Sequence, residues 1–284
     1  MDRRELVFGS GDDSCAAWLY RADGAGDAAP IVVMAHGLSG TRRDRLGAFA
    51  ARFAAAGIAA LVFDHRGFGD STGEPDLFEP ERQLDDWRAA LAFARSLPGI
   101  DATRVATFGS SLGGGNALAA AAEDSRVAAA ISQVPFLDMS QAYRPSRSVT
   151  EQMLLAAEQG RHLPAVGQPH EPAFINAPDS EAGWRHVVAI GEDSRWRNRV
   201  SARWLVGPPY RPVRHAATLH CPWLVCVGEA DQVAKPEVAI AAARRAPLGE
   251  LRTYAGVDHF DIYDGPQHEA VVADEVAFLR RQLL

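Results

Sequence analysis

The chain has 284 residues, of which 47% are hydrophobic and 23% are charged, and its formal net charge is −7. This length allows one large domain or two small ones with a sizeable core, and the composition is that of an ordinary globular protein. The acidic balance argues against a nucleic-acid-binding protein, which would need a clustered basic face, and no apolar run reaches the roughly 18–20 residues that span a bilayer.

The N-terminal residues and the cysteines indicate where the protein works. Residues 1–5 lead straight into a predicted strand rather than into an apolar signal core, so we expect no export segment. Cys15, Cys221 and Cys226 are an odd number without metal-ligand spacing, which predicts buried thiols in a reducing compartment. We therefore expect a cytoplasmic protein that binds neither nucleic acid nor membrane.

Strands and helices alternate along the first half of the chain. Two short runs, 5–8 and 14–20, flank turn residues and predict an antiparallel hairpin. Continuous apolar strands and amphipathic helices then follow in turn. The strands are expected at 31–35, 58–63, 105–108 and 127–134, and the helices at 42–56, 80–97 and 112–122. This order predicts a doubly wound, mostly parallel sheet with functional loops at the carboxyl ends of its strands.

The alternation breaks between residues 136 and 218. Only helix-compatible pieces occur there, at 150–161, about 180–190 and 195–206, together with three of the six tryptophans. A structureless loop of this length is improbable in a compact domain, so we expect a helical cap over the site, with an ordinary helical layer as the alternative. Strands at 223–227 and 250–254 and helices at 235–246 and 267–284 resume the pattern. The predicted core is therefore residues 1–135 and 219–284, with the cap at 136–218.

A sharp strand-to-helix turn with the pattern Gly-x-Ser-x-Gly occurs at residues 109–113. A strand before it and an alanine-rich helix after it give the context of a nucleophile elbow, in which a strained serine exposes its hydroxyl. Gly109 and Gly113 stand where a Cβ would crowd the turn. The register makes Ser111 the predicted nucleophile, because Ser110 occupies an x position. The alternative is a small-residue turn that packs a helix onto a sheet.

A serine nucleophile needs a base within hydrogen-bond reach and an acid that orients the base. Two later loops follow predicted strands, and they supply Asp231 as the acid and His259 as the base, in the chain order expected after an elbow. Glu229 lies closer to its strand end, and Asp258 is adjacent to His259 in sequence, so both are poorer acids. Six other histidines follow no strand end and are not expected to act: His162, His170, His186, His215, His220 and His268.

The developing oxyanion needs preorganised donors. We expect the N–H of Leu112, at the start of the helix, and the N–H of Leu38, in the loop after strand 31–35, with His36 bracing that loop. Asp64, Arg66 and Ser71 are expected to hold their own loop together. Aromatic residues are candidates for an apolar acyl pocket under the cap: Phe136, Trp184, Trp196 and Tyr210. We expect no metal and no cofactor.

These motifs resemble those of the serine α/β-hydrolase superfamily. The resemblance rests on His36-Gly37 and on the stretches 64–71, 109–113, 228–231 and 258–260, and it covers nearly the whole chain. Three further stretches are similar to the branch of dienelactone-hydrolase-like esterases and of polyketide transferases or thiohydrolases: 85–88, 132–135 and 196–199. The serine at the elbow differs from the aspartate of haloalkane dehalogenases and epoxide hydrolases.

The resemblance implies the α/β-hydrolase fold and a cofactor-independent enzyme that cleaves a carboxylic ester or thioester of a small acyl substrate through an acyl-enzyme on Ser111. Acyl transfer or thiohydrolysis in a polyketide or other natural-product pathway, a prolyl-type peptidase, and a ligand-binding relative without turnover stay open as alternatives. The sequence also leaves open whether the chain forms a homodimer.

Overall fold

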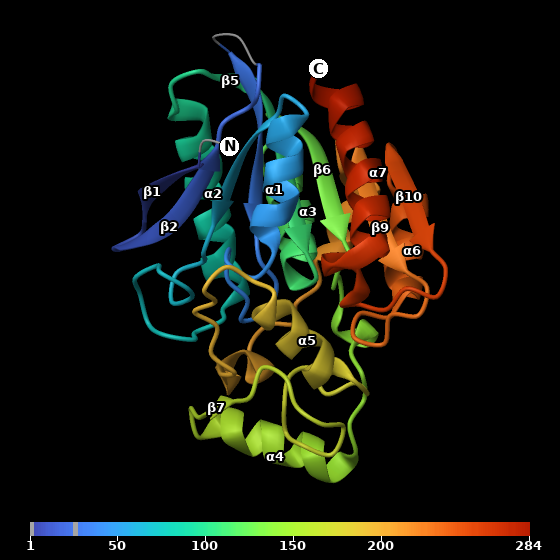
Figure 1. Cartoon of the computed structure of the whole chain (residues 1–284). Coiled ribbons are helices and arrows are strands. Elements are labelled where there is room, and N and C mark those ends of the chain that lie inside the picture. The colour runs from blue at the N-terminus through green and yellow to red at the C-terminus, as the bar shows by residue number, and fades with distance from the viewer. Residues whose placement is uncertain (1–2, 25–27) are drawn as a thin grey trace.

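The computed structural model describes residues 3–24 and 28–284. Within them, an eight-stranded sheet runs through the molecule in the order β1-β2-β4-β3-β5-β6-β9-β10 (Figure 1). Its strands are β1 (Arg3–Ser10), β2 (Asp13–Tyr20), β3 (Ala29–Ala35), β4 (Ala59–Phe63), β5 (Ile100–Ser110), β6 (Val127–Gln133), β9 (Trp223–Gly228) and β10 (Gly249–Tyr254). β2 pairs antiparallel with β1 and β4, and the remaining pairs are parallel. The predicted hairpin and mostly parallel sheet are confirmed.

Helices cover both faces of the sheet because its central strands are apolar on both sides. In β3, Ile31 and Val33 join the cluster under α2 (Pro80–Ser96), α3 (Leu112–Glu123) and α6 (Pro236–Arg245). Val32 and Met34 point the other way, into the cluster under α1 (Leu46–Ala55) and α7 (Gly265–Leu283). Alternate side chains of one strand therefore fill two separate cores. The predicted burial of the three cysteines is also confirmed.

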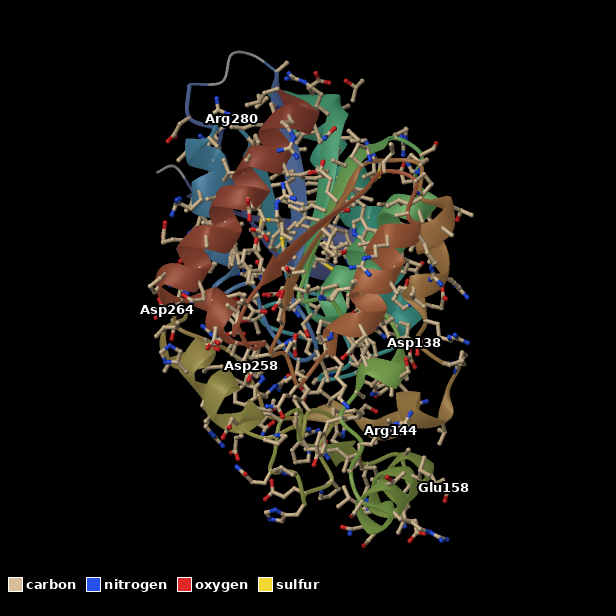
Figure 2. The ribbon with its side chains drawn as sticks, turned by 90° about the vertical axis from the view of Figure 1, so that its right-hand side faces the viewer. Asp138, Arg144, Glu158, Asp258, Asp264 and Arg280 are labelled. Carbon is tan, nitrogen blue, oxygen red and sulfur yellow. The ribbon has the colours of Figure 1, made fainter. Side chains whose placement is uncertain are left out.

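Residues 136–218, here called the inserted segment, lie between β6 and β9. They form α4 (Arg147–Glu158), α5 (Ser180–Ala189), the short antiparallel pair β7 (His162–Leu163) and β8 (Val200–Ser201), and three 3-10 turns, η1 (Met139–Gln141), η2 (Ala202–Val206) and η3 (Pro212–Thr218). α4, α5 and β7 lie below the sheet in Figure 1. In Figure 2, Arg144 and Glu158 mark this end and Arg280 the opposite end. The division into a core and a cap stays a prediction.

No helix in the described ranges is both long enough and apolar enough to cross a membrane.

The helix predicted at 42–56 begins later, at Leu46. Residues 41–45 form a loop instead, because Arg42 turns into the protein, where it is 1% exposed. Its guanidinium pairs with the carboxylate of Asp64, and its backbone N–H donates to the same carboxylate at 2.6 Å. Arg45 then takes a left-handed conformation with φ 73° immediately before α1. The apolar periodicity reveals nothing of this buried ion pair, so the helix start was predicted four residues too early.

The helix predicted at 195–206 is wrong. The chain there is irregular as far as β8, with a tight turn in which the N–H of Arg199 donates to the carbonyl oxygen of Arg197 at 2.7 Å, and the 3-10 turn η2 follows. Arg197 and Arg199 both reach the buried carboxylate of Asp76, at 3.0 and 3.3 Å. On a helix, residues two apart do not lie side by side, so these two ion pairs favour the observed turn over a helix.

Candidate active site

Ser111 lies at the junction of β5 and α3. Its backbone has φ 58° and ψ −126°, a strained conformation for a residue with a Cβ. The two glycines of the turn allow close approach: a Cβ on Gly109 would lie 1.9 Å from the carbonyl oxygen of Gly113, and a Cβ on Gly113 would lie 2.5 Å from that of His36. The crowding predicted for both glycines is confirmed.

Ser111, His259 and Asp231 are in contact, as their positions after strand ends predict. Ser111 Oγ lies 3.1 Å from His259 Nε2, and His259 Nδ1 lies 2.7 Å from Asp231 Oδ2. The other carboxylate oxygen of Asp231 accepts the backbone N–H groups of Val233 and Ala234, each at 2.8 Å. These two bonds fix the carboxylate so that Oδ2 faces the imidazole. A proton held on Nδ1 by this carboxylate leaves Nε2 free to accept the serine proton.

Neither alternative acid contacts the imidazole. Glu229 is exposed. Asp258 instead accepts the backbone N–H of His259 at 2.7 Å and that of Gln232 at 3.3 Å, so it connects the two loops that carry Asp231 and His259. In Figure 2, Asp258 lies at the level where the sheet meets the inserted segment.

The loop after β3 packs directly against the elbow. A Cβ on Gly37 would lie only 3.0 Å from Ser111 Cβ and 3.1 Å from the carbonyl oxygen of Ser110. This contact places Leu38 beside the serine, and Leu38 and Leu112 both line the cavity described below. Within the described residues, neither of these two N–H groups donates in the backbone hydrogen bonds of loops, turns and caps.

His36 braces this loop in the neutral form. Burial, together with the neighbouring His65, lowers the pKa of His36 to about 3. Its Nε2 accepts the backbone N–H of His65 at 3.1 Å, so its Nδ1 carries the proton and donates to the carbonyl oxygen of Gly37 at 2.8 Å. The bracing role predicted for His36 is therefore present in the hydrogen bonds.

A largely apolar cavity of about 210 Å³ opens beside Ser111. Among the described residues, those that line it from outside the inserted segment are Leu38, Ser111, Leu112 and Val233. The segment supplies the rest: Phe136, Met139, Ala142, Tyr143, Pro145, Thr150, Met153, Leu154, Ala173, Phe174, Ile175, Asn176, Ala177, Trp204 and Leu205. None of the residues that line this cavity in the described chain carries a charge. We call it the Ser111 cavity.

Residues 26–264 match the family model described as serine aminopeptidase, S33. The chain belongs to this family. It is 41% identical over 290 residues to the quorum-quenching protein AidA of Acinetobacter baumannii, with 98% of this chain and 94% of the relative covered. It is 26% identical over 298 residues to the polyketide transferase af380 of Aspergillus fumigatus, with 100% and 99% covered.

Solved structures similar to this S33 protein are α/β-hydrolases. GrgF from Penicillium sp. sh18 matches with a TM-score of 0.85 at 22% identity, covering 100% of this chain and 99% of that chain. Est1E from Butyrivibrio proteoclasticus, with ferulic acid bound, matches with a TM-score of 0.70 at 20% identity, covering 98% of both. The fold is the α/β-hydrolase fold, and the chain is an enzyme of the hydrolase class, as the motifs predict.

Of the four aromatic residues predicted for the acyl pocket, Phe136 lines the Ser111 cavity and the other three lie outside it. The indole N–H of Trp196 donates to Ser39 Oγ at 3.0 Å, and the ring of Trp184 packs edge-on against that of Trp196, 6.0 Å away. Both tryptophans thus support the loop that contains Leu38 rather than the cavity wall.

Tyr210 is turned away from the Ser111 cavity by its hydroxyl. That hydroxyl is 2.9 Å from the carbonyl oxygen of Leu112 and 3.0 Å from Asn116 Oδ1, both on α3. The aromatic residues that the prediction missed are Tyr143, Phe174 and Trp204, and the rings of the last two stack 5.5 Å apart in the cavity wall. Aromatic content alone could not separate these three from the other aromatic residues of the inserted segment.

The stretch 132–135 of this S33 protein holds the elbow in place. Ser132 Oγ donates to the carbonyl oxygen of Gly114 at 2.7 Å, and the carbonyl oxygen of Gln133 accepts the N–H of Ser111 at 2.9 Å. The stretch 196–199 supports the inserted segment in a similar way, because the Asn198 side chain makes two bonds of 2.9 Å to the backbone of Val166.

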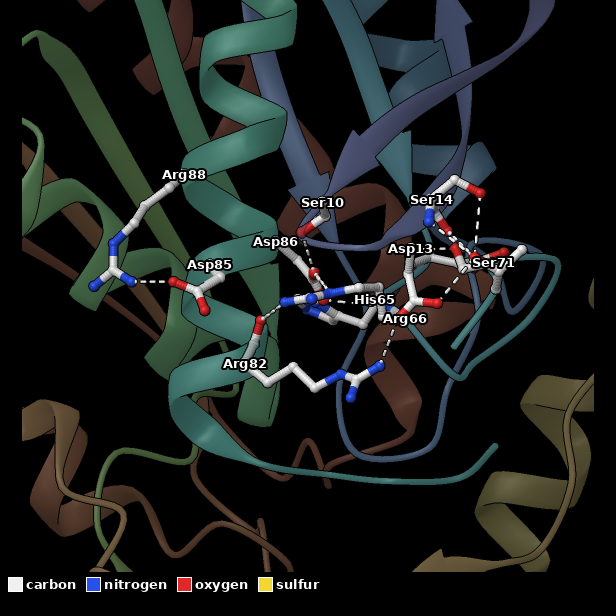
Figure 3. A network of polar contacts seen from close by, with 12 residues as sticks. Ser10, Asp13, Ser14, His65, Arg66, Ser71, Arg82, Asp85, Asp86 and Arg88 are labelled. Carbon is white, nitrogen blue, oxygen red and sulfur yellow. Dashed lines mark hydrogen bonds and ion pairs between the residues drawn. The ribbon is translucent and has the colours of Figure 1, made fainter. Parts of the chain in front are cut away.

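The third stretch, 85–88, contains a buried carboxylate that the site depends on. Asp86 accepts from Ser10 Oγ at 2.7 Å, from His65 Nδ1 at 3.2 Å, and from the backbone and side chain of Arg66 (Figure 3). Burial raises the pKa of Asp86, but the donors from His65, Ser10 and Arg66 outweigh it and hold the pKa below its ordinary value. Asp86 thereby fixes His65, whose backbone N–H in turn fixes His36.

Asp64 and Ser71 hold the loop after β4 as predicted. Asp64 pairs with Arg42 and accepts the N–H of Asp70 at 3.1 Å, and Ser71 Oγ donates to the carbonyl oxygen of Asp64 at 2.7 Å. Among the described residues, no group of three or more histidine, cysteine, aspartate or glutamate side chains could hold a metal ion.

Proposed function

We propose that this S33 protein is a serine acyl hydrolase that cleaves a carboxylic ester or thioester through an acyl-enzyme on Ser111. The observation that carries the proposal is the contact of Ser111 with His259 at 3.1 Å and of His259 with Asp231 at 2.7 Å, at the edge of an apolar cavity. Ser111 is 9% exposed, so its hydroxyl is accessible from that cavity.

In the first step, His259 Nε2 accepts the proton of Ser111 Oγ while the oxygen attacks the carbonyl carbon of the substrate. Asp231 stabilises the imidazolium that forms. His259 then returns the proton to the leaving alcohol or thiol as the tetrahedral intermediate collapses to an acyl-enzyme. Water attacks this ester by the same route, and Ser111 is regenerated.

The N–H groups of Leu112 and Leu38 are proposed as donors to the oxyanion of the tetrahedral intermediate. Leu112 begins α3, where the helix dipole also favours a negative charge. The close packing of Gly37 on Ser111 supports the second donor, because it keeps the Leu38 loop beside the nucleophile.

The lining of the Ser111 cavity supports an uncharged acyl group. An aminopeptidase needs an anionic group to hold the α-ammonium of its substrate, and none of the lining residues is an aspartate or glutamate. Apolar contacts with Leu112, Phe136 and Phe174 favour a hydrocarbon chain instead. Although the family model is described as serine aminopeptidase, we propose that this chain acts on acyl esters or thioesters rather than on peptides.

The test begins with a fluorophosphonate, which reacts with activated serines, and intact-protein mass spectrometry. We expect one adduct, lost in Ser111→Ala, and turnover of p-nitrophenyl esters or acyl thioesters. Asp231→Asn should lower kcat by roughly 10⁴-fold, by analogy with the wrong imidazole tautomer in serine proteases. Glu229→Gln is the matched control, because Glu229 lies in the same loop but is exposed, and it should leave turnover unchanged.

The outcomes separate the alternatives. An adduct without hydrolysis, followed by product formation when an alcohol or amine acceptor is added, would replace hydrolysis by acyl transfer, the activity in the name of the relative af380. Preference for aminoacyl amides over esters would favour a peptidase. Absence of any adduct would refute the proposal and leave a ligand-binding protein.

Quorum quenching, the role in the name of the relative AidA, is a biological context that fits the same chemistry. A signal molecule with an ester bond would be inactivated by hydrolysis at Ser111. Incubating such a signal with the wild type and with Ser111→Ala, and then assaying the remaining signal, tests this role.

A further inference from the structure

We propose that Tyr263 is a positioning residue, whose hydrogen bond to the hydroxyl of Ser110 sets the position of His259 relative to Ser111. This inference rests on the proposed function, because it concerns the proton transfer between those two side chains. It assigns a role to Ser110, the residue of the elbow that precedes the nucleophile.

The bond joins the segment that carries the base to the turn that carries the nucleophile. Phe260 follows His259, and the 3-10 turn η4 (Asp261–Tyr263) begins at the next residue. Tyr263 Oη lies 2.5 Å from Ser110 Oγ, and both side chains are buried, at 4% and 1% exposure. Three residues lie between His259 and Tyr263, and Ser110 is directly adjacent to Ser111. The bond therefore fixes a short segment on each side of the catalytic contact.

Gln133 bonds to both Ser110 and Ser111 at the same turn. Its side-chain Nε2 donates to Ser110 Oγ at 3.0 Å, and its backbone carbonyl accepts the N–H of Ser111 at 2.9 Å. Gln133, at the end of β6, therefore holds both the Ser110 hydroxyl that bonds to Tyr263 and the backbone of Ser111. A displacement of His259 relative to Ser111 has to break or stretch this set of bonds.

The surroundings of Tyr263 keep its hydroxyl protonated and hold its turn in place. Burial raises the pKa of Tyr263 well above its ordinary value, so the hydroxyl keeps its proton throughout the pH range in which enzymes work. The backbone carbonyl of Tyr263 also accepts Arg45 Nε at 2.8 Å, which fixes the turn to the loop before α1. By contrast, Asp261 and Asp264 on either side are exposed. Within this turn, Tyr263 therefore supplies the polar contact with the elbow.

The test is Tyr263→Phe, which removes the hydroxyl and keeps the ring. A misplacement near 1 Å costs about 100-fold in rate, so we expect kcat to fall by roughly 10–100-fold. KM should stay unchanged, because Tyr263 does not line the Ser111 cavity. The rate of fluorophosphonate labelling should fall in parallel with kcat, since it reports the nucleophilicity of Ser111.

Tyr254→Phe is the matched control. Its hydroxyl is also bonded, to Asp274 at 2.9 Å, but that bond connects β10 to α7 and does not contact the elbow. Loss of this hydroxyl should leave kcat and the labelling rate unchanged. A role in stability alone would lower the melting temperature of Tyr263→Phe and leave both rates, measured well below that temperature, at the wild-type level.

Ser110→Ala removes the same bond from the other side, together with the bond from Gln133, and serves as the second variant if Tyr263→Phe does not fold. The double variant should be no slower than Ser110→Ala alone, because the bond that Tyr263→Phe deletes is already absent there. Additive losses, or wild-type kcat in both single variants, would overturn the inference while the proposed function stood. A wild type that neither labels nor hydrolyses would overturn both.

Discussion

Asp86→Asn tests how strongly the buried carboxylate on α2 holds the loop behind the site. The substitution keeps the shape of the side chain but removes its charge, and an amide N–H₂ group replaces one of the oxygens that accept from Ser10, His65 and Arg66. The carboxylate is 1% exposed and the Arg66 side chain 8% exposed, so this pair is shielded from water. Breaking one partner of a buried pair costs about 3–5 kcal/mol.

Asp85→Asn is the control, because the adjacent carboxylate makes an ion pair of a different kind. Asp85 and its partner Arg88 are 57% and 49% exposed. Such surface pairs contribute at most about 1 kcal/mol. Both pairs are visible in Figure 3.

Urea unfolding followed by circular dichroism measures the two changes in free energy of unfolding, and thermal unfolding gives the matching melting temperatures. At about 2–4 °C per kcal/mol for a domain near this size, Asp86→Asn should lower the melting temperature by roughly 6–20 °C. Equal urea midpoints for Asp86→Asn and Asp85→Asn would refute the reasoning.

The cost of Asp86→Asn should also depend on pH. The pKa of Asp86 is held below its ordinary value of 3.8 in the folded state, so the unfolded chain binds the proton more tightly. The stability that the carboxylate supplies is therefore complete above pH 3.8 and is lost as the pH falls through the lower folded pKa. The difference in free energy of unfolding between the wild type and Asp86→Asn should narrow in that acidic range. A difference that does not change with pH would contradict this.

Three further changes test other parts of the molecule. Gly109→Ala would place a Cβ 1.9 Å from the carbonyl oxygen of Gly113, so we expect loss of folded protein or of fluorophosphonate labelling, and normal labelling would contradict the tight turn. Burial of Asp44 outweighs the hydrogen bonds that its carboxylate accepts and raises its pKa from 3.8 to about 6. The folded state therefore binds the proton of this carboxyl more tightly than the unfolded chain does, so the free energy of unfolding of the wild type should fall as the pH rises from about 4 to 6. Asp44→Asn should flatten this part of the pH–stability curve, measured by urea unfolding. Phe174→Ala enlarges the Ser111 cavity and should raise the ratio of kcat/KM for octanoyl over butyryl p-nitrophenyl esters, and an unchanged ratio would remove Phe174 from the acyl-binding wall.

The sequence predicts the groups around Ser111 well because each of them follows the end of a strand of the sheet. Parallel strands bring their carboxyl ends to one edge, so short loops after them place Ser111, Asp231 and His259 together, although their catalytic roles remain predictions. Asp86 also carries a sequence signal, since it lies on the same face of its helix as Gln83 and Ala90, which are buried. A charge on the core face of a helix predicts a buried partner, but the partner itself cannot be named from the sequence.

The cavity wall is less predictable for a physical reason. Trp196 and Trp204 come from the same segment and have the same side chain, yet one supports Ser39 and the other lines the cavity. Trp196 bonds to Ser39, and Trp204 packs against Phe78 and Phe174, so contacts between segments far apart in the chain accompany their positions. Local periodicity holds no information on such contacts.

The origin of the cavity wall has a consequence for how this enzyme can change. The residues that we propose to react follow strand ends of the sheet, whereas nearly all of the wall belongs to the inserted segment. Substitutions in that segment can therefore alter which acyl chain fits while the geometry of Ser111, Asp231 and His259 stays the same. Under the proposed function, chemistry and selectivity are encoded in separate stretches of the chain, so descendants of this protein can acquire new substrates without rebuilding the reaction.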